Sequence, residues 1–253
     1  MQNDRVGMKN TNFQGLEMTI IKYNNASDIV VKFEDGREVS TSYKYFSNGG
    51  VRNKFVPSVK GVGIIGSERV TDSNGKDIIS YIIWRGMLER CYDGKYQEKK
   101  STYKNCIVCE EWIYYSTFKE WYDKNYYKIN SERVCLDKDI LAKGNKLYSP
   151  ETCVFVPERI NSLFTKCNKS RGELPIGVYL KKESGKFQSR CNYLQDGKKY
   201  LKHIGYFKTP EEAFNAYKIF KEKYIKQVAD EYKHKIPQKL YDAMYRYEVE
   251  ITD

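Results

Sequence analysis

The segment from residue 177 to residue 228 constrains the fold most, because a two-residue alternation of side chains gives way there to a helical pattern. Three basic, aromatic-rich stretches, the last ending in Gly205-Tyr206-Phe207, predict three strands, and Asp196-Gly197 is a strong hairpin signal. Thr209-Pro210 predicts a helix start, because threonine caps a helix and proline suits its first position. The segment therefore predicts an antiparallel sheet braced by one helix.

The second predicted strand has two chemically different faces. Phe187, Ser189 and Cys191 form an apolar or small face, and Gln188, Arg190 and Asn192 form a hydrogen-bonding face. A basic, hydrogen-bonding face of this kind fits the major groove of duplex DNA. The side chains predicted to lie against the other face follow at helical spacing: Ala213, Ala216, Tyr217, Phe220 and Tyr224.

The charge of the chain supports a polyanionic partner. The sequence has 44 lysines and arginines against 33 aspartates and glutamates, a formal net charge of +11. Residues 166–208 alone hold 11 basic and three acidic side chains. A basic stretch that coincides with the predicted sheet favours nucleic acid, whereas the charge alone would also suit a solubilising surface on an ordinary small α+β domain.

This segment resembles the DNA-binding domain of plant ethylene-response factors, the apetala-type domain. The matching residues are Gly177-Val178, Gly185-Lys186-Phe187, Ile204-Gly205-Tyr206-Phe207 and Glu211-Glu212-Ala213 with Ala216-Tyr217. That family often has arginine at the places of Tyr179 and Lys181 and tryptophan at the place of His203, so its base preference does not transfer. The resemblance implies that the groove-facing residues are Tyr179, Lys181, Arg190, Asn192 and His203. The basic and polar side chains of the same strands and turn complete the predicted DNA-binding set: Lys182, Lys186, Gln188 and Lys199.

The N-terminal part predicts a small β module. Leu16–Ile20 alternates, Asp28–Phe33 is strand-like, and Asp35-Gly36 is a hairpin signal. We expect a small β-barrel over residues 1–60, with no chemistry of its own evident, followed by a glycine-containing linker at residues 61–76.

The central part carries a second resemblance. A helical pattern from Ile79 to Cys91 precedes two strand-like stretches, a loop with Gly144-Asn145, and a helix beginning near Pro157. This ββα order is similar to the HNH-type proteins common in phages. In active members of that family, a histidine at the end of the first strand acts as general base and a bound metal stabilises the developing charge.

The expected histidine is absent. The two histidines, His203 and His234, lie outside the segment, and Lys138 stands between Asp137 and Asp139 at the expected position. A protonated lysine cannot accept a proton from water, although it could contact a phosphate. We therefore expect a degenerate domain, and keep an active one as the alternative. The candidate catalytic residues are Asp137, Lys138, Asp139, Asn145 and Asn161, and the oxygen atoms of Asp137 and Asp139 are candidate ligands of Mg²⁺.

The cysteines are relevant to zinc binding and to the cellular compartment of the protein. Cys106 and Cys109 have the spacing of a zinc ligand pair, but no second such pair exists, and thiols in apolar contexts are typically buried. Seven cysteines, an odd number, without a signal peptide predict a reducing cytoplasm, that of a bacterial host for a phage-encoded protein. No apolar run approaches 18 residues, so no membrane span is expected.

Taken together, these patterns predict an α+β chain from a phage or mobile element that binds double-stranded DNA, with a regulatory or anti-defence role suggested by lineage. The alternatives are a metal-dependent homing-type endonuclease or nickase, and an interaction protein that grips a host protein. The last predicted element is a C-terminal helix, with Leu240, Met244 and Tyr247 packing back. The expected order is a barrel at 1–60, a linker at 61–76, a ββα domain at 77–165, a DNA-binding domain at 173–235 and a helix at 236–253.

Overall fold

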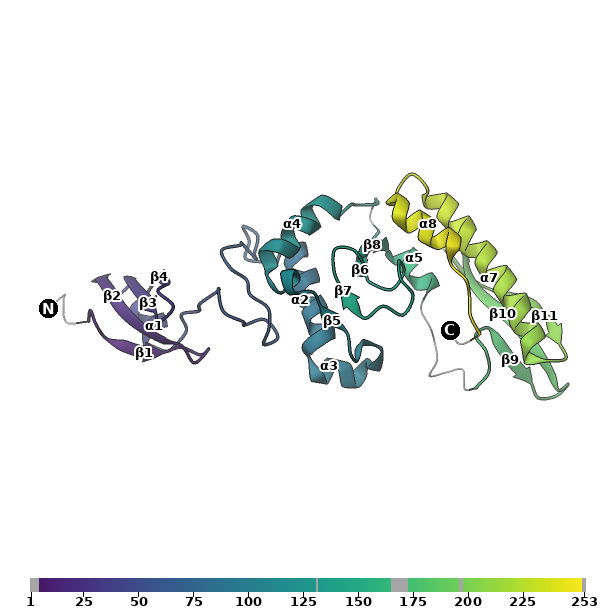
Figure 1. Cartoon of the computed structure of the whole chain (residues 1–253), viewed down its shortest axis with the longest axis horizontal. Coiled ribbons are helices and arrows are strands. Elements are labelled where there is room, and N and C mark those ends of the chain that lie inside the picture. Colours follow the sequence, from purple (N-terminus) through teal and green to yellow (C-terminus); the bar gives the residue numbers. More distant parts are fainter. Residues whose placement is uncertain (1–4, 131, 165–172, 196–197, 252–253) are drawn as a thin grey trace. The chain divides into compact units, whose positions relative to one another are not determined.

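The computed structural model describes residues 5–130, 132–164, 173–195 and 198–251 (Figure 1). The predicted Asp196-Gly197 turn and the basic segment 166–172 lie outside these residues. The chain is mixed α+β and divides into two units, Met1–Lys124 and Asn125–Asp253. Seven α-helices lie within the described residues, and none of them is long and apolar enough to cross a membrane.

The first unit begins with a four-stranded antiparallel sheet in the order β1-β2-β3-β4, and a short helix follows it. Gly36, at φ +84°, forms the predicted turn between β3 and β4. The sheet does not close, so the predicted barrel is wrong: four strands, two of them of three and four residues, are too few to curl round and pair their edges. The elements are β1 Lys9–Thr11, β2 Glu17–Asn25, β3 Asp28–Phe33, β4 Glu38–Thr41 and α1 Tyr43–Ser47.

The rest of the first unit is helical and aromatic. The indole of Trp84 donates to the Trp112 carbonyl oxygen over 2.7 Å, and both side chains are buried. Within the expected linker, Gly63 lies against Trp84, and Ile64 bonds to the backbone of Ile113, so this segment packs on the helices. The elements are α2 Ile79–Tyr92, α3 Gly94–Lys99, η1 Ser101–Tyr103, β5 Ile107–Val108, η2 Glu110–Ile113 and α4 Tyr115–Asn125.

The second unit begins with the expected ββα order. The strand β6, Val134–Asp137, pairs antiparallel with β8, Val154–Pro157, and α5, Glu158–Leu163, follows directly. The short strand β7, Leu147–Tyr148, lies between β6 and β8 in sequence. We call residues 134–163 the ββα motif.

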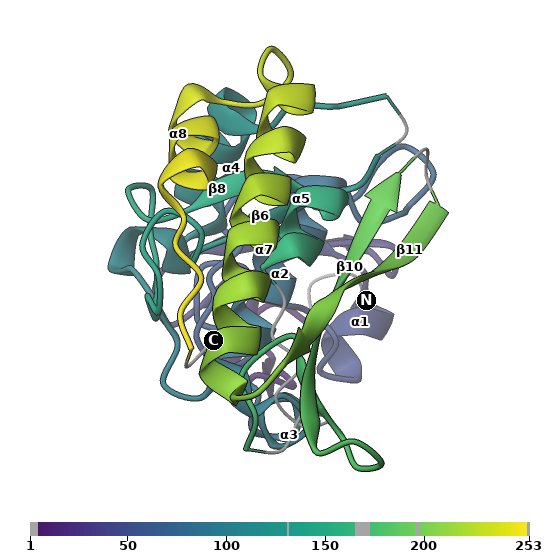
Figure 2. The same cartoon turned by 90° about the vertical axis from the view of Figure 1, so that its right-hand side faces the viewer.

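The predicted sheet and helix follow. The sheet has the order β11-β10-β9, and α7 covers one of its faces (Figure 2). The Thr209 hydroxyl accepts a hydrogen bond from the Glu212 N–H, so the predicted helix cap is confirmed. Val178, Cys191, Ala213 and Tyr217 form the core between sheet and helix. The elements are β9 Val178–Lys181, β10 Lys186–Gln195, β11 Lys198–Phe207 and α7 Pro210–Tyr232.

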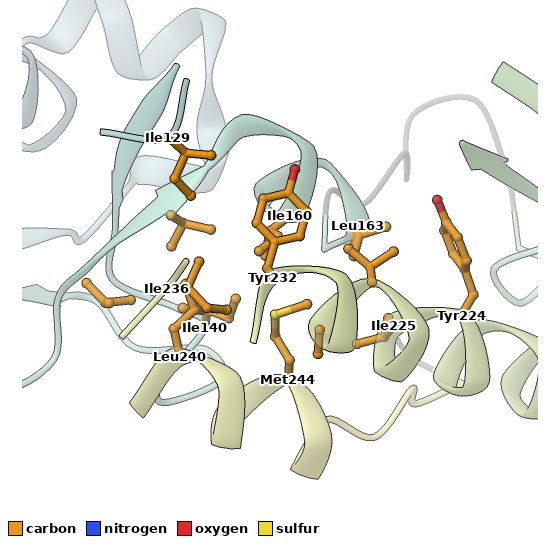
Figure 3. Packing of buried hydrophobic residues seen from close by; sticks show 14 residues of the cluster. Ile129, Ile140, Ile160, Leu163, Tyr224, Ile225, Tyr232, Ile236, Leu240 and Met244 are labelled. Carbon is orange, nitrogen blue, oxygen red and sulfur yellow. The ribbon is translucent and has the colours of Figure 1, made fainter. Parts of the chain in front are cut away.

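The helix α7 belongs to two cores. Its first half packs on the sheet, whereas Ile225, Val228 and Tyr232 of its second half pack with Val156 and Ile160 of the ββα motif (Figure 3). The C-terminal helix α8, Gln238–Arg246, adds the buried side chains of Leu240 and Met244, as predicted. The ββα motif, α7 and α8 therefore share one hydrophobic core.

Candidate nucleic-acid interface

The face of the sheet that points away from α7 gathers polar, basic and aromatic side chains. Strand pairing sets them in rows: Gln188 lies opposite Tyr179 on β9 and Tyr206 on β11, and Arg190 lies opposite His203. Because side chains alternate along each strand, the buried Ser189 and Cys191 point toward α7. We call this the outer face, and it includes Tyr179, Lys181, Lys186, Gln188, Arg190, Asn192, Lys199, Leu201, His203 and Tyr206.

A β-bulge decides which residues reach the outer face from β11. From Gln195 opposite Lys198 to Arg190 opposite His203, the register is regular. It then shifts by one residue, so that Gly205 lies opposite Ser189 and Tyr206 opposite Gln188. The bulge therefore turns Tyr206 outward and Phe207 inward, where Phe207 packs against the core under the sheet.

Arg190 is held in place at the centre of the outer face. Its guanidinium carbon lies 3.6 Å from the ring centroid of Tyr179, a close cation–π stack. Its backbone N–H donates to the carbonyl oxygen of Gly177 over 2.9 Å. Stacking uses the flat face of the guanidinium, so its N–H edges can donate to another molecule.

Tyr206 gathers two further side chains. The ammonium of Lys181 lies 5.4 Å from the centroid of its ring, and the ring of His203 lies 4.6 Å from it. Lys181 also lies 3.9 Å from the Glu183 carboxylate, a long and exposed ion pair that is worth little energy. The lysine therefore remains available to an anionic partner.

The predicted DNA-binding residues come together on this surface with one exception. Lys182 lies in the turn after β9 and is exposed there. Tyr206 and Leu201 also lie on the outer face, although neither was among the predicted residues. Plain alternation from Arg190 opposite His203 would put Tyr206 inside, and only the apolar Phe207 at its side hinted that the register shifts.

Beneath the outer face, burial disfavours the charged forms of three groups. Burial raises the pKa of the Cys191 thiol and of the Tyr217 hydroxyl, and burial lowers the pKa of the Lys221 amine. Each of these shifts disfavours a charge between the sheet and α7. The positive charge of this segment is therefore concentrated on the solvent side.

Three of the candidate catalytic residues, Lys138, Asp139 and Asn145, form a hydrogen-bonded network within one loop. Lys138 is only 4% exposed, and its ammonium donates to the Asp139 carboxylate and to the Asn145 carbonyl oxygen, each over 2.6 Å. The Asn145 amide in turn donates to the carbonyl oxygens of Lys138 and Leu147. Lys138 is thus bound to its own loop and is not presented to a phosphate at the surface.

The remaining candidates are placed differently. The Asp137 carboxylate accepts the backbone N–H groups of Asp139 and Ile140, and burial raises its pKa. Asn161 lies half-buried on α5. Cys106 is buried and Cys109 is half-buried. Across the described ranges, no three histidine, cysteine, aspartate or glutamate side chains are grouped closely enough to hold a metal ion.

No protein-family model matches the sequence, and neither a curated protein nor a solved structure matches the chain.

Proposed function

We propose that the chain binds double-stranded DNA through the outer face of its three-stranded sheet. The observation that carries this proposal is the stacked guanidinium of Arg190 at the centre of the basic outer face. The helix α7 packs on the other face of the same sheet. Lysines stand at both ends of that face, Lys181 and Lys186 at one end and Lys199 at the other. Lysine heads suit phosphates, and arginine and amide groups suit base edges.

The dimensions of the sheet support the major groove as the binding site. Neighbouring strands lie about 4.8 Å apart, so three strands span roughly 10 Å, against a groove about 12 Å wide. The strand β9 pairs only with Lys186–Ser189 of β10. Beyond Arg190, whose N–H still donates to Gly177 next to β9, the sheet is therefore a two-stranded ribbon, which the major groove admits.

The first test is titration of the full chain with a labelled duplex at several salt concentrations. Each neutralised phosphate contributes a slope of about −0.9 in the logarithm of affinity against the logarithm of salt, so several lysine contacts predict a steep fall. Substitution of Lys181 and Lys186 by alanine together should reduce that slope by about two. Lys226→Ala, an exposed lysine on α7, is the matched control and should leave the slope unchanged. Absent or salt-independent binding refutes the proposal.

We also propose that the ββα motif does not hydrolyse DNA. This rests on Lys138, which stands at the place of the expected base and is tied to Asp139 and Asn145. General-base catalysis is typically worth about 10²–10⁴ in rate, so its loss leaves cleavage slow or nil. Supercoiled plasmid incubated with the chain and Mg²⁺ should stay intact. Robust nicking that Asp137→Ala and Asp139→Ala both abolish would make the chain a nuclease.

A further inference from the structure

We infer that the outer face recognises a guanine and an adenine two base pairs apart, through Arg190 and Asn192. This inference rests on the proposed DNA binding and specifies the target sequence. Both side chains lie on β10, with His203 and Leu201 opposite them on β11.

The spacing follows from the regular register of this part of the sheet. The pairs Arg190–His203, Cys191–Lys202 and Asn192–Leu201 are consecutive, and the bulge lies before Arg190. Two residues along a strand advance about 6.8 Å, and two base-pair steps of duplex DNA advance about the same distance. A strand that follows the groove therefore brings Arg190 and Asn192 to base pairs that have one base pair between them.

The chemistry of the two side chains assigns the bases. A guanidinium edge donates two hydrogen bonds that match O6 and N7 of guanine, and the stack on Tyr179 fixes the plane of Arg190 before binding. The amide of Asn192 both donates and accepts, which matches N7 and the amino group of adenine. Asn192 is exposed, so its amide is accessible to a base edge.

Leu201 adds an apolar contact to the same adenine–thymine pair. It is 57% exposed, and it lies directly opposite Asn192. Opposed side chains in an antiparallel pair are about 5 Å apart, so both reach one base pair. An exposed leucine there suits the C5 methyl group of the thymine that pairs with the adenine.

Gln188 has amide chemistry too, but it lies beyond the bulge. The register shift between Ser189 and Arg190 places the extra residue, Ile204, on β11, and the ladder bends and twists at this point. Gln188 also lies between the rings of Tyr179 and Tyr206 in its row and is half-buried. We therefore assign only Arg190 and Asn192 to the two-base-pair spacing.

The experiment is a selection of duplexes from a random library by the full chain. A guanine and an adenine separated by one base pair should be enriched, and Arg190→Ala should lose only the guanine and Asn192→Ala only the adenine. Each loss should reduce discrimination by about 5- to 150-fold. Tyr179→Phe keeps the ring stack and should retain the guanine preference, whereas Tyr179→Leu should weaken that preference more than it weakens overall affinity.

Base analogues test the same contacts without changing the protein. Replacing the guanine by 7-deazaguanine removes the N7 acceptor, and replacing the thymine by deoxyuridine removes the methyl group; both should weaken binding. If the full chain binds no duplex, the proposed function fails. If the full chain binds duplex with the expected steep dependence on salt but selects neither base, or selects them at another spacing, the DNA-binding function stands and this inference is overturned.

Discussion

At the scale of single residues, Lys138 is best understood from its surroundings. Its side chain is buried among polar groups of one loop, and a buried ammonium must be paired to be tolerated. Asp139 supplies the opposite charge, and the Asn145 carbonyl oxygen supplies a second acceptor. Lys138 therefore acts as an internal cation that closes the loop after β6.

Removing this ammonium should destabilise the second unit. Lys138→Met keeps the aliphatic stem but leaves the Asn145 carbonyl oxygen without its donor, which should cost about 1–3 kcal/mol of unfolding free energy. Urea unfolding followed by circular dichroism measures this change. Lys99→Met, an exposed lysine on α3, is the control and should change stability by less than about 0.5 kcal/mol. Equal effects of the two substitutions would show that Lys138 does not close the loop.

The raised pKa of Asp137 predicts how the stability of the folded chain depends on pH. Burial raises the pKa of its carboxyl in the folded chain, so the folded state keeps the proton to a higher pH than the unfolded state. Its contribution to stability is therefore lost as pH rises from the usual carboxyl value of about 3.9 through the raised value. Asp137→Asn keeps the acceptor oxygen without the charge. Its stability relative to the wild type should increase between pH of about 4 and neutrality, as urea titrations at both values would reveal. A constant difference contradicts the prediction.

At the scale of elements, the approach of the sheet to α7 depends on Gly177. An added Cβ there would lie 2.1 Å from the Tyr217 ring, and the backbone has φ +77°. Gly177→Ala should therefore cost about 2–5 kcal/mol, from backbone strain and overpacking together. Gly185→Ala, with φ +66° and no heavy atom within 4 Å, isolates the strain and should cost about 1–2 kcal/mol. Thermal unfolding of the two variants compares them, and similar losses would exclude the packing effect.

The sequence allowed the strands, the helix and most of the outer face to be predicted, because alternation and capping are local signals. Phe187, Ser189 and Cys191 face inward as expected, and Thr209 caps α7. The bulge was not predictable, because it depends on the balance between a regular ladder and the burial of Phe207. The ion pair of Lys138 with Asp139 was missed for a related reason: burial of a charge is a property of the tertiary structure.

At the scale of the whole molecule, the sequence patterns predicted separate small modules, but the second unit has connected cores. Tyr224 of α7 exchanges hydrogen bonds with the backbone of Leu194 on β10, while its ring lies in the core shared with the ββα motif. Near the C-terminus, the Val249 N–H donates to Glu222 of α7. No local pattern specifies such contacts, since their partners are far apart in sequence.

This connection predicts how fragments behave. A fragment of residues 125–253 keeps both cores of the second unit and should unfold cooperatively. A fragment of residues 173–235 leaves Ile225, Val228 and Tyr232 uncovered and should be poorly structured or associate. Circular dichroism melts and light scattering distinguish these outcomes. A shorter fragment as stable as the longer one would show that α7 does not need its second core.

The membership of α7 in two cores has a mechanical consequence. A helix of 23 residues is about 34 Å long, and it is packed along its length on the sheet and then on the ββα motif. A force applied to the sheet is therefore transmitted through α7 to the ββα motif, because no flexible segment of the helix lies between the two cores. Under tension in an optical trap, the second unit should therefore unfold in a single step, in which the sheet and the ββα motif unfold together.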